Sequence, residues 1–388
     1  HVEAGLHDKL ERDPDLVAAA AAAGLELRDL RRVPDGLSTP SGAGLGVQAR
    51  IVHTVGTDCA IGKMTVTLEL AAAARAAGQL VNAIVPYAAK PVPVVATVAE
   101  AAALGAQCLA IGVAPTGGKL PPAWKAALLE ALALGLHVEA GLHDKLAGDP
   151  DLVAAAAAGK LELRDLRRVP EGLSTPSGAG LGVPARIVHT VGTDCAIGKM
   201  TVTLELAAAA QAAGENAVFV PTGQIGISIA GWGIAVDDVV SDYVAGAAEA
   251  LVLEGAERGD LLLVEGQGAI LHPLYSGVTL GLLHGSTPHA LVLVHEAGAT
   301  RIDLEDRGGP PGPLIPPLPE LADLLLRLTS PIRPAPVVAI ALSTRTIASD
   351  AEAQAAIAAV EAETGLVCDD PVRFGADRLW QAVAKALA

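Results

Sequence analysis

The sequence has few aromatic residues, few basic residues and few cysteines. Aromatic side chains make up only 2% of the 388 residues, whereas 51% are hydrophobic. Such a core must be aliphatic, which suits Ala/Leu helices packed on Val/Ile/Leu strands and excludes a disordered chain. The formal net charge of −16 argues against a nucleic-acid partner, because a phosphate backbone needs a basic face. Four cysteines without a CxxC pair provide no disulfide framework, and we expect a reducing cytoplasm.

Long hydrophobic runs are also missing. No segment reaches the roughly 18 uninterrupted apolar residues of a membrane-spanning helix, so no membrane partner is expected. The first residues, HVEAGLHDKLERDPD, are charged from the outset, unlike a secretory signal. Both observations agree with a cytoplasmic location.

A long internal duplication is the most distinctive feature present. Residues 1–78 repeat as residues 137–214 without a gap, and only positions 11, 12, 23, 24, 35, 48 and 75 of the first copy differ. Each copy ends in HTVGTDCAIGKMTVTLEL. The chain therefore carries two candidate phosphate-binding loops, Gly56–Thr65 and Gly192–Thr201.

Short apolar strands alternate with Ala-rich helices along the chain, which predicts an α/β fold with mostly parallel sheets. We expect a Rossmann-like N-terminal domain followed by a P-loop domain. The expected boundaries are a duplicated partial segment (1–50), the Rossmann-like domain (51–173), a Pro/Gly/Ser-rich linker (174–186) and the P-loop domain (187–388). Expected elements include strands at 80–85, 92–96, 107–112 and 260–264, and helices at 98–104, 123–134, 199–213 and 236–251.

The second loop has the sequence context that a P-loop needs, because it follows an apolar strand and opens a helix. Glycines allow main-chain N–H groups to converge on phosphate oxygens, and the lysine neutralises phosphate charge. The spacing is one residue longer than GxxxxGK[ST], and Met200 stands where a hydroxyl is usual, with Thr201 beside it. The alternative is a tight strand–helix turn without a ligand. The predicted cofactor-binding residues are Gly192, Thr193, Asp194, Cys195, Ala196, Ile197, Gly198, Lys199, Met200 and Thr201, together with Thr222 and Gln224 after the next strand.

An acidic residue ends the apolar strand DLLLVEGQG and is well placed to serve this loop. P-loop sites use a carboxylate at the end of a neighbouring strand to hold Mg²⁺, which predicts a metal role for Glu265. A solvated glutamate is the alternative. The first copy has no such partner of its own, so we expect only the second loop to be competent.

Several other polar residues are candidates for the same site. His272 and His284 flank a glycine-broken loop, and either could be a general base for an amine or simply fix that loop. Asp237, Asp238 and Asp242 are expected to open a helix, where they cap it or bind an amine. His295 is expected near the same sheet edge. Cys195 is expected to pack as a small residue rather than to act as a nucleophile.

Two resemblances emerge from these motifs. GTDCAIGKM with LLLVEGQGAILHPL resembles dethiobiotin synthetase-type P-loop enzymes. That resemblance implies phosphate binding by Lys199 and Mg²⁺ binding by Asp194 and Glu265, with Thr201 as the candidate hydroxyl ligand. From about residue 92 onward, the runs IGVAPTGGKLPPAW, GLHDKL, PTGQIGISIAGWGIAVDDVVSDYVAGAAE and EGQGAILHPLYSGVTLGLLHG resemble the DgcN family. That family has a P-loop domain of formerly unknown function and includes a D-glutamate N-acetyltransferase.

Three functions remain open at this stage. The DgcN resemblance implies N-acetylation of a D-amino acid with acetyl-CoA, using Lys199, His272 and Glu265 as catalytic residues. The second is an ATP–Mg²⁺-dependent kinase or ligase acting on a carboxylate, and the third is a non-enzymatic nucleotide-binding regulatory protein. The two enzyme functions imply a small-molecule substrate, either an amino acid or a carboxylate. A homo-oligomer is compatible with each.

Overall fold

The computed structural model describes residues 2–4, 27–29, 95–111, 119–304 and 311–388. The chain divides into two compact units, residues 1–41 and 42–388. In the first unit, β1 (Val2–Ala4) pairs in parallel with β2 (Leu27–Asp29), and Val2 is opposite Leu27. The second copy of the repeat forms the same pair in the same register, so the duplicated sequence forms this strand pair twice. The first loop, Gly56–Thr65, and the expected strand at 80–85 lie outside the described residues.

The second unit begins with a small parallel sheet covered by helices. Its strands, in the order β3-β4-β5, are Cys108–Ile111, His137–Ala140 and Leu163–Asp165, and its helices are α3 (Val98–Ala103), α4 (Pro122–Ala133) and α5 (Pro150–Gly159). Leucine and valine side chains from these elements form one buried cluster, which includes Leu128, Val138 and Leu152. The strand expected at 92–96 is not formed at residues 95 and 96.

Helix α5 shows how the local sequence sets an element's ends. The Asp149 side chain accepts the main-chain N–H groups of Asp151 and Leu152, and Pro150 occupies the first turn, where its missing N–H costs nothing. The helix ends at Lys160, which adopts a left-handed conformation.

A second, six-stranded parallel sheet forms the core of the P-loop domain. Its strand order is β11-β10-β9-β6-β8-β7. The strands are β6 (Arg186–Gly192), β7 (Ala217–Val220), β8 (Leu261–Val264), β9 (Ala290–Glu296), β10 (Val337–Ser343) and β11 (Val367–Asp369). All four residues of β8 are buried, as a strand covered on both faces requires. The prediction of a mostly parallel α/β fold is confirmed.

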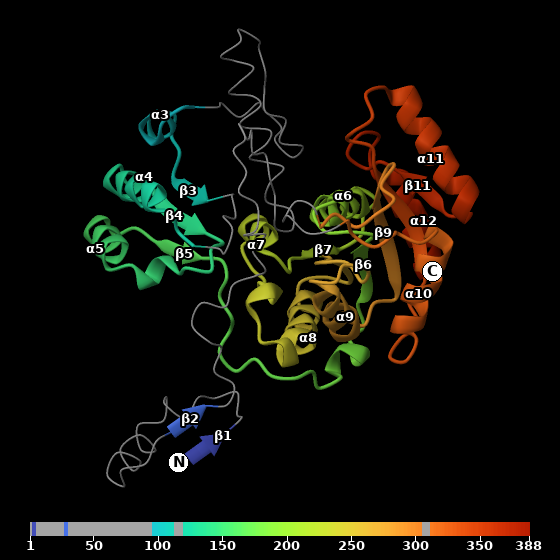
Figure 1. Ribbon diagram of the computed structural model, residues 1–388, viewed down its shortest axis with the longest axis horizontal. Helices are drawn as coiled ribbons and strands as arrows, with labels where there is room; N and C mark the ends of the chain where they lie inside the picture. Colours follow the sequence, from blue (N-terminus) through green and yellow to red (C-terminus); the bar gives the residue numbers. More distant parts are fainter. Residues whose placement is uncertain (1, 5–26, 30–94, 112–118, 305–310) are drawn as a thin grey trace. The chain divides into compact units, whose positions relative to one another are not determined.

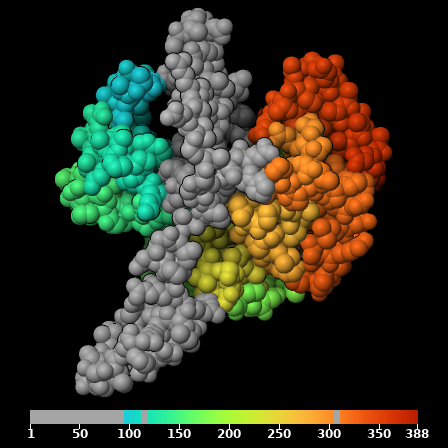
Figure 2. Space-filling model, viewed as in Figure 1, coloured from blue at the N-terminus to red at the C-terminus, as the bar shows by residue number. Residues whose placement is uncertain are grey.

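Helices cover both faces of this sheet (Figure 1). Helices α6 (Lys199–Ala212) and α12 (Asp377–Leu387) pack on one face. The other face is covered by α8 (Val244–Ala256), α9 (Ser276–Ser286), α10 (Leu318–Thr329) and α11 (Asp350–Thr364). Alternate strand residues serve the two faces: Leu261 and Leu263 pack toward α6, whereas Leu262 packs toward α8. The atoms coloured orange to red, which include those of α10, α11 and α12, gather on one side of the view in Figure 2. Among the described residues, no helix has the length and apolar character to cross a membrane.

Two sequence expectations about helices were wrong. The helix expected at 236–251 begins only at Val244, because residues 236–238 and 241–243 form separate 3₁₀ turns. The segment expected to be a glycine-broken loop is helix α9. Its glycines permit close packing on α8: a Cβ on Gly281 would lie 2.7 Å from Val244 Cγ1, and one on Gly285 would lie 2.0 Å from the carbonyl oxygen of Ala245.

The segment predicted as a linker, residues 174–186, is fastened to α8. The Glu249 carboxylate accepts the main-chain N–H groups of Ser177 and Gly180, at 2.6 Å and 3.2 Å. A Cβ on Gly246 would lie 1.8 Å from the carbonyl oxygen of Ser174. The chain therefore crosses the surface of α8 on a fixed path before it enters β6.

Candidate phosphate-binding site

The second loop forms the strand–loop–helix geometry that the sequence predicts. Strand β6 ends at Gly192, and α6 begins at Lys199. Within the loop, Ala196 has a φ of +53° and Gly198 a φ of +103°. Left-handed conformations at such positions turn successive N–H groups toward a common point, as in anion-binding nests.

Lys199 lies within the loop and is only 5% exposed. Its ammonium group donates to the carbonyl oxygen of Asp194 at 2.7 Å. A Cβ on Gly192 would lie 3.1 Å from the Lys199 Nζ. The absence of a side chain at Gly192 therefore leaves space for the Lys199 side chain to reach the Asp194 carbonyl oxygen. The Asp194 and Glu265 carboxylates lie close enough to interact with this positive charge, and a phosphate anion bound in the loop would interact with it in the same way.

The ends of β6 and β8 are joined by hydroxyl groups that the sequence analysis did not single out. Thr190 Oγ1 lies 2.8 Å from Thr203 Oγ1 of α6 and accepts the Gly266 N–H at 3.0 Å. A Cβ on Gly266 would lie only 1.8 Å from the carbonyl oxygen of Thr190. The glycine after Glu265 is therefore required for close approach between these strands.

Glu265 is buried, with 2% of its surface exposed. Its Oε2 accepts the main-chain N–H groups of Thr222 and Gly223, at 2.9 Å and 3.1 Å, and its Oε1 accepts the Gln267 side-chain amide at 3.2 Å. Burial raises the pKa of this carboxyl group from 4.5 to about 7, while the Thr222 and Gly223 hydrogen bonds oppose the shift. A carboxyl group that titrates near neutral pH can exchange a proton under physiological conditions.

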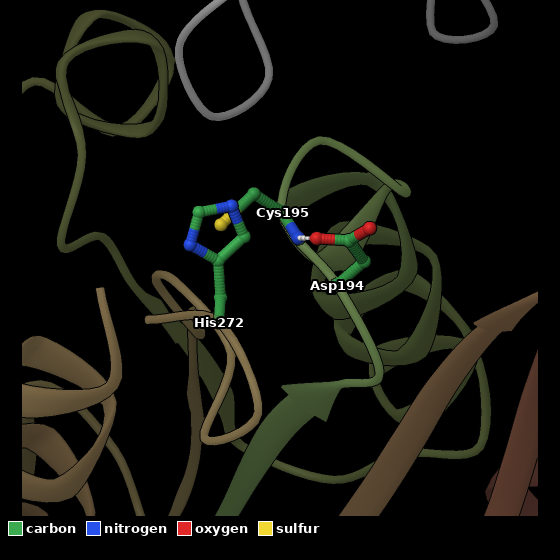
Figure 3. Close-up of side chains that lie close together, drawn as sticks. All are labelled: Asp194, Cys195 and His272. Atoms are coloured by element: carbon green, nitrogen blue, oxygen red, sulfur yellow. Dashed lines mark hydrogen bonds between the residues drawn. The ribbon is translucent and has the colours of Figure 1, made fainter. Parts of the chain in front are cut away.

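Asp194, Cys195 and His272 form a group at the opening of the loop. One potential ligand atom from each lies within 4.8 Å of the others, and the His272 ring faces the turn that carries Asp194 and Cys195 (Figure 3). Burial raises the pKa of Asp194, although the Asp303 and Cys195 N–H groups oppose this. In the described part of the chain this is the one such group of three; Glu265, predicted to share a metal with Asp194, is not in it.

The remaining predicted residues lie in two places. Thr193 Oγ1 lies 3.0 Å from His295 Nδ1, so His295 supports the start of the loop from β9. Met200 and Thr201 are half-buried in the first turn of α6. His284 does not join the site, because its Nε2 lies 2.9 Å from the carbonyl oxygen of Leu328 and connects α9 with α10.

Gln224 begins the short helix α7 (Gln224–Ala230) and connects the site to the Rossmann-like part of the chain. Its amide donates to both carboxylate oxygens of Asp237, which also forms an ion pair with the buried Arg167. Lys145 forms an ion pair with the neighbouring Asp238 at 2.7 Å. Asp237 and Asp238 therefore do not begin the expected long helix: they lie in the 3₁₀ turn Val236–Asp238, before α8 starts at Val244, and they bind cations of the preceding domain. Sequence alone gave no signal for these partners.

Comparisons with known proteins agree with this geometry. Residues 38–85 and 174–380 match a P-loop domain of unknown function, DUF1611, and residues 74–169 match its Rossmann-like N-terminal domain. The match at 38–85 places the first loop in the P-loop family as well. The sequence-derived domain limits remain predictions.

Two curated relatives carry a functional name. A D-glutamate N-acetyltransferase from Tritonibacter scottomollicae is 40% identical over 74% of this chain and 84% of its own length. One from a Pseudoalteromonas species is 36% identical over 73% of this chain and 83% of its own length.

A crystal structure of a DUF1611 family protein from Anabaena variabilis has 43% sequence identity and a TM-score of 0.69. The match covers 76% of this chain and 85% of that protein. Together with the P-loop and the preceding Rossmann-like sheet, these matches show that the chain belongs to the DUF1611 family.

Proposed function

We propose that this chain is an N-acetyltransferase that acts on a D-amino acid such as D-glutamate, with acetyl-CoA as acetyl donor. The observation that carries the proposal is the identity of 40% and 36% to two D-glutamate N-acetyltransferases, over most of each protein. The loop at 192–201 adds a physical reason, because CoA carries a diphosphate.

The residues of the loop fit a phosphate-bearing cosubstrate. The buried Lys199 ammonium and the left-handed turn at Ala196 and Gly198 form a positive cradle. Acetyl-CoA supplies an acetyl group as a thioester. Because its pantetheine arm is long, a diphosphate in this cradle puts the thioester away from Lys199, so the lysine binds and orients the donor.

An attacking amine must lose a proton before or during acyl transfer. Of the predicted catalytic residues, Glu265 is the acid whose pKa lies near 7. Because Glu265 lies close to Lys199, a donor held in this cradle keeps its thioester away from Glu265 as well, and Thr222 and Gly223 hold the carboxylate at the phosphate end of the site.

The alternative function, an ATP–Mg²⁺-dependent kinase or ligase, relies on Asp194, Thr201 and Glu265 as metal ligands. Asp194 accepts the N–H groups of Cys195 and Asp303, and Glu265 accepts those of Thr222 and Gly223. Each carboxylate is thus held by main-chain N–H groups of a different pair of segments.

The test is to incubate the full chain with D-glutamate and acetyl-CoA and to follow both N-acetylglutamate and free CoA. We expect turnover that EDTA does not reduce. Turnover of ATP that requires Mg²⁺, without acetyl transfer, would establish the kinase or ligase instead. If a folded protein catalyses neither reaction, the result would favour the third function, a non-enzymatic nucleotide-binding regulatory protein.

A further inference from the structure

Acetyl transfer to an amine needs a proton acceptor that lies away from the phosphate loop, because the thioester is remote from Lys199 and Glu265. A neutral imidazole can take a proton near neutral pH. Of the histidines in the described ranges, His143 is the exposed one, with 42% of its side chain open to solvent. A substrate that enters from solution can therefore reach it.

His143 follows β4 and lies where the Rossmann-like sheet meets the P-loop domain. Gly141, in the same turn, packs on Gln224: a Cβ on Gly141 would lie 2.8 Å from Gln224 Cβ. The residue before Gln224, Gly223, donates its N–H to the Glu265 carboxylate at 3.1 Å. His143 thus follows the carboxyl end of a parallel strand, the usual ligand-binding edge of an α/β sheet, close to the segment that borders the phosphate site.

Asp238 is placed to orient the His143 ring. His143 Nδ1 lies 3.8 Å from Asp238 Oδ1, whereas Asp238 Oδ2 accepts the Lys145 ammonium at 2.7 Å. Burial raises the pKa of Asp238, but the neighbouring His143 and Lys145 side chains lower it overall. A carboxylate beside Nδ1 stabilises the proton on that nitrogen and leaves Nε2 to act as the base. Catalytic contacts of this kind are often long without substrate and shorten when it binds.

We propose that His143 is the proton acceptor for the attacking amine and that Asp238 is the positioning residue that orients its ring. The substrate class is the primary α-amine of an amino acid. This inference rests on the acetyl transfer of the proposed function.

The proton transfer fits the chemistry of the acceptor. The amino acid binds as an ammonium ion, and His143 Nε2 takes one of its protons. The nitrogen lone pair then attacks the thioester carbonyl carbon, so that an N–C bond forms, and the C–S bond breaks with its electron pair going to sulfur. A second proton of the nitrogen ends on the CoA thiolate. The proton on His143 passes to solvent, so each turnover releases one proton.

The test follows acetyl transfer from acetyl-CoA to D-glutamate in the full chain and, separately, CoA affinity by calorimetry. His143→Gln should lower kcat about 100-fold or more and leave CoA affinity unchanged. Added imidazole should restore part of the rate of His143→Ala, because the position is exposed. His7→Gln, the same change in the first copy, is the matched control and should keep the wild-type rate. Thermal unfolding verifies that each variant is folded.

The pH profile separates a base from a structural role. The charged groups around the ring come from its own turn, from the end of β5 and from the turn before α8: Asp144, Lys145, Arg167, Asp237 and Asp238. The wild-type kcat should rise with pH as the imidazole loses its proton, and this limb should be missing in His143→Gln. Asp238→Asn should move the limb to lower pH, because without the negative charge the imidazole loses its proton more easily.

Three results would overturn the inference. A wild-type kcat in His143→Gln would do so while leaving the proposed function intact. A loss that imidazole does not rescue, or that comes with weaker CoA binding, would give His143 a structural or binding role instead. A folded wild type that binds CoA but transfers no acetyl group would reject the proposed function and this inference together.

Discussion

Glu265 and Thr222 form a reciprocal pair at the ends of β8 and β7. The Glu265 carboxylate accepts the Thr222 main-chain N–H at 2.9 Å, and the Thr222 hydroxyl donates to the Glu265 carbonyl oxygen at 2.8 Å. Both residues are buried. The carboxyl group is thus fixed at a sheet edge, beside the phosphate loop, in surroundings that disfavour its charge.

The first prediction concerns stability against pH. Because burial raises the pKa of Glu265 to about 7 from 4.5, the folded state binds this proton more tightly than the unfolded state does. The protonated Glu265 therefore adds on the order of 3 kcal/mol to the free energy of unfolding, relative to the charged form. This stabilisation is fully present below about pH 4.5 and is lost as the pH rises through about 7. Chemical denaturation at pH 5 and pH 8 should show this loss in the wild type and a smaller one in Glu265→Gln. An identical pH dependence in the two proteins would contradict it.

The duplication provides a matched test of the two loops. Lys199→Ala should weaken CoA binding by on the order of tenfold to a hundredfold, because it removes a charged donor to phosphate. Lys63→Ala, the same change in the first copy, should leave affinity unchanged, since that loop has no strand-end acid of its own. Calorimetric titration of both variants measures this. Equal losses would show that both loops bind ligand.

Arg167→Ala should destabilise the protein. The Arg167 guanidinium is 2% exposed, donates through Nε to the Gly141 carbonyl oxygen and forms an ion pair with Asp237. Its removal should cost on the order of 2 to 3 kcal/mol, less than for a fully buried pair because Asp237 is 32% exposed. Urea denaturation measures the loss, and Arg31→Ala in the first copy is the control. A similar cost for both would mean that the first copy makes an equivalent contact.

Two glycine substitutions should have opposite effects. Gly266→Ala would place a Cβ 1.8 Å from the Thr190 carbonyl oxygen, whereas a Cβ on Gly277 would meet nothing within 4 Å. We expect Gly266→Ala to lower the free energy of unfolding by about 3 kcal/mol or more. Gly277→Ala, within α9, should raise it by up to about 1 kcal/mol. Denaturation curves of both variants are the measurement, and a tolerated Gly266→Ala would show that β6 and β8 can separate.

A further prediction concerns the strained backbone of Ala196 in the loop Gly192–Thr201. Ala196 has a φ of +53°, a conformation that costs a residue with a Cβ about 1 kcal/mol. Ala196→Gly should therefore stabilise the fold by about that amount in urea denaturation. The same change at Ala208, an exposed position in the interior of α6, should instead destabilise it by about 1 kcal/mol. A loss of stability in Ala196→Gly would show that the loop tolerates its conformation without strain.

The sequence by itself determined the elements whose signals are local. The apolar run before Gly192, the glycines and lysine after it, and the Ala/Leu pattern that follows define β6, the loop and α6. The apolar strand before Glu265 could also be predicted from the sequence, because a strand buried on both faces appears as a continuous hydrophobic run. The parallel arrangement followed from the alternation of such strands with helices.

Only the tertiary structure decided which distant residues meet. His272 approaches Cys195 because β6 and β8 are neighbours in the sheet and their carboxyl ends share one edge. Asp237 and Asp238 have acidic side chains at what looked like a helix start, yet cations of another domain bind them. The glycines of α9 looked like loop residues because the helix α8 that requires them lies elsewhere in the sequence. Periodicity and propensity report a residue's own segment, whereas ion pairs and close helix contacts depend on the segment that packs against it.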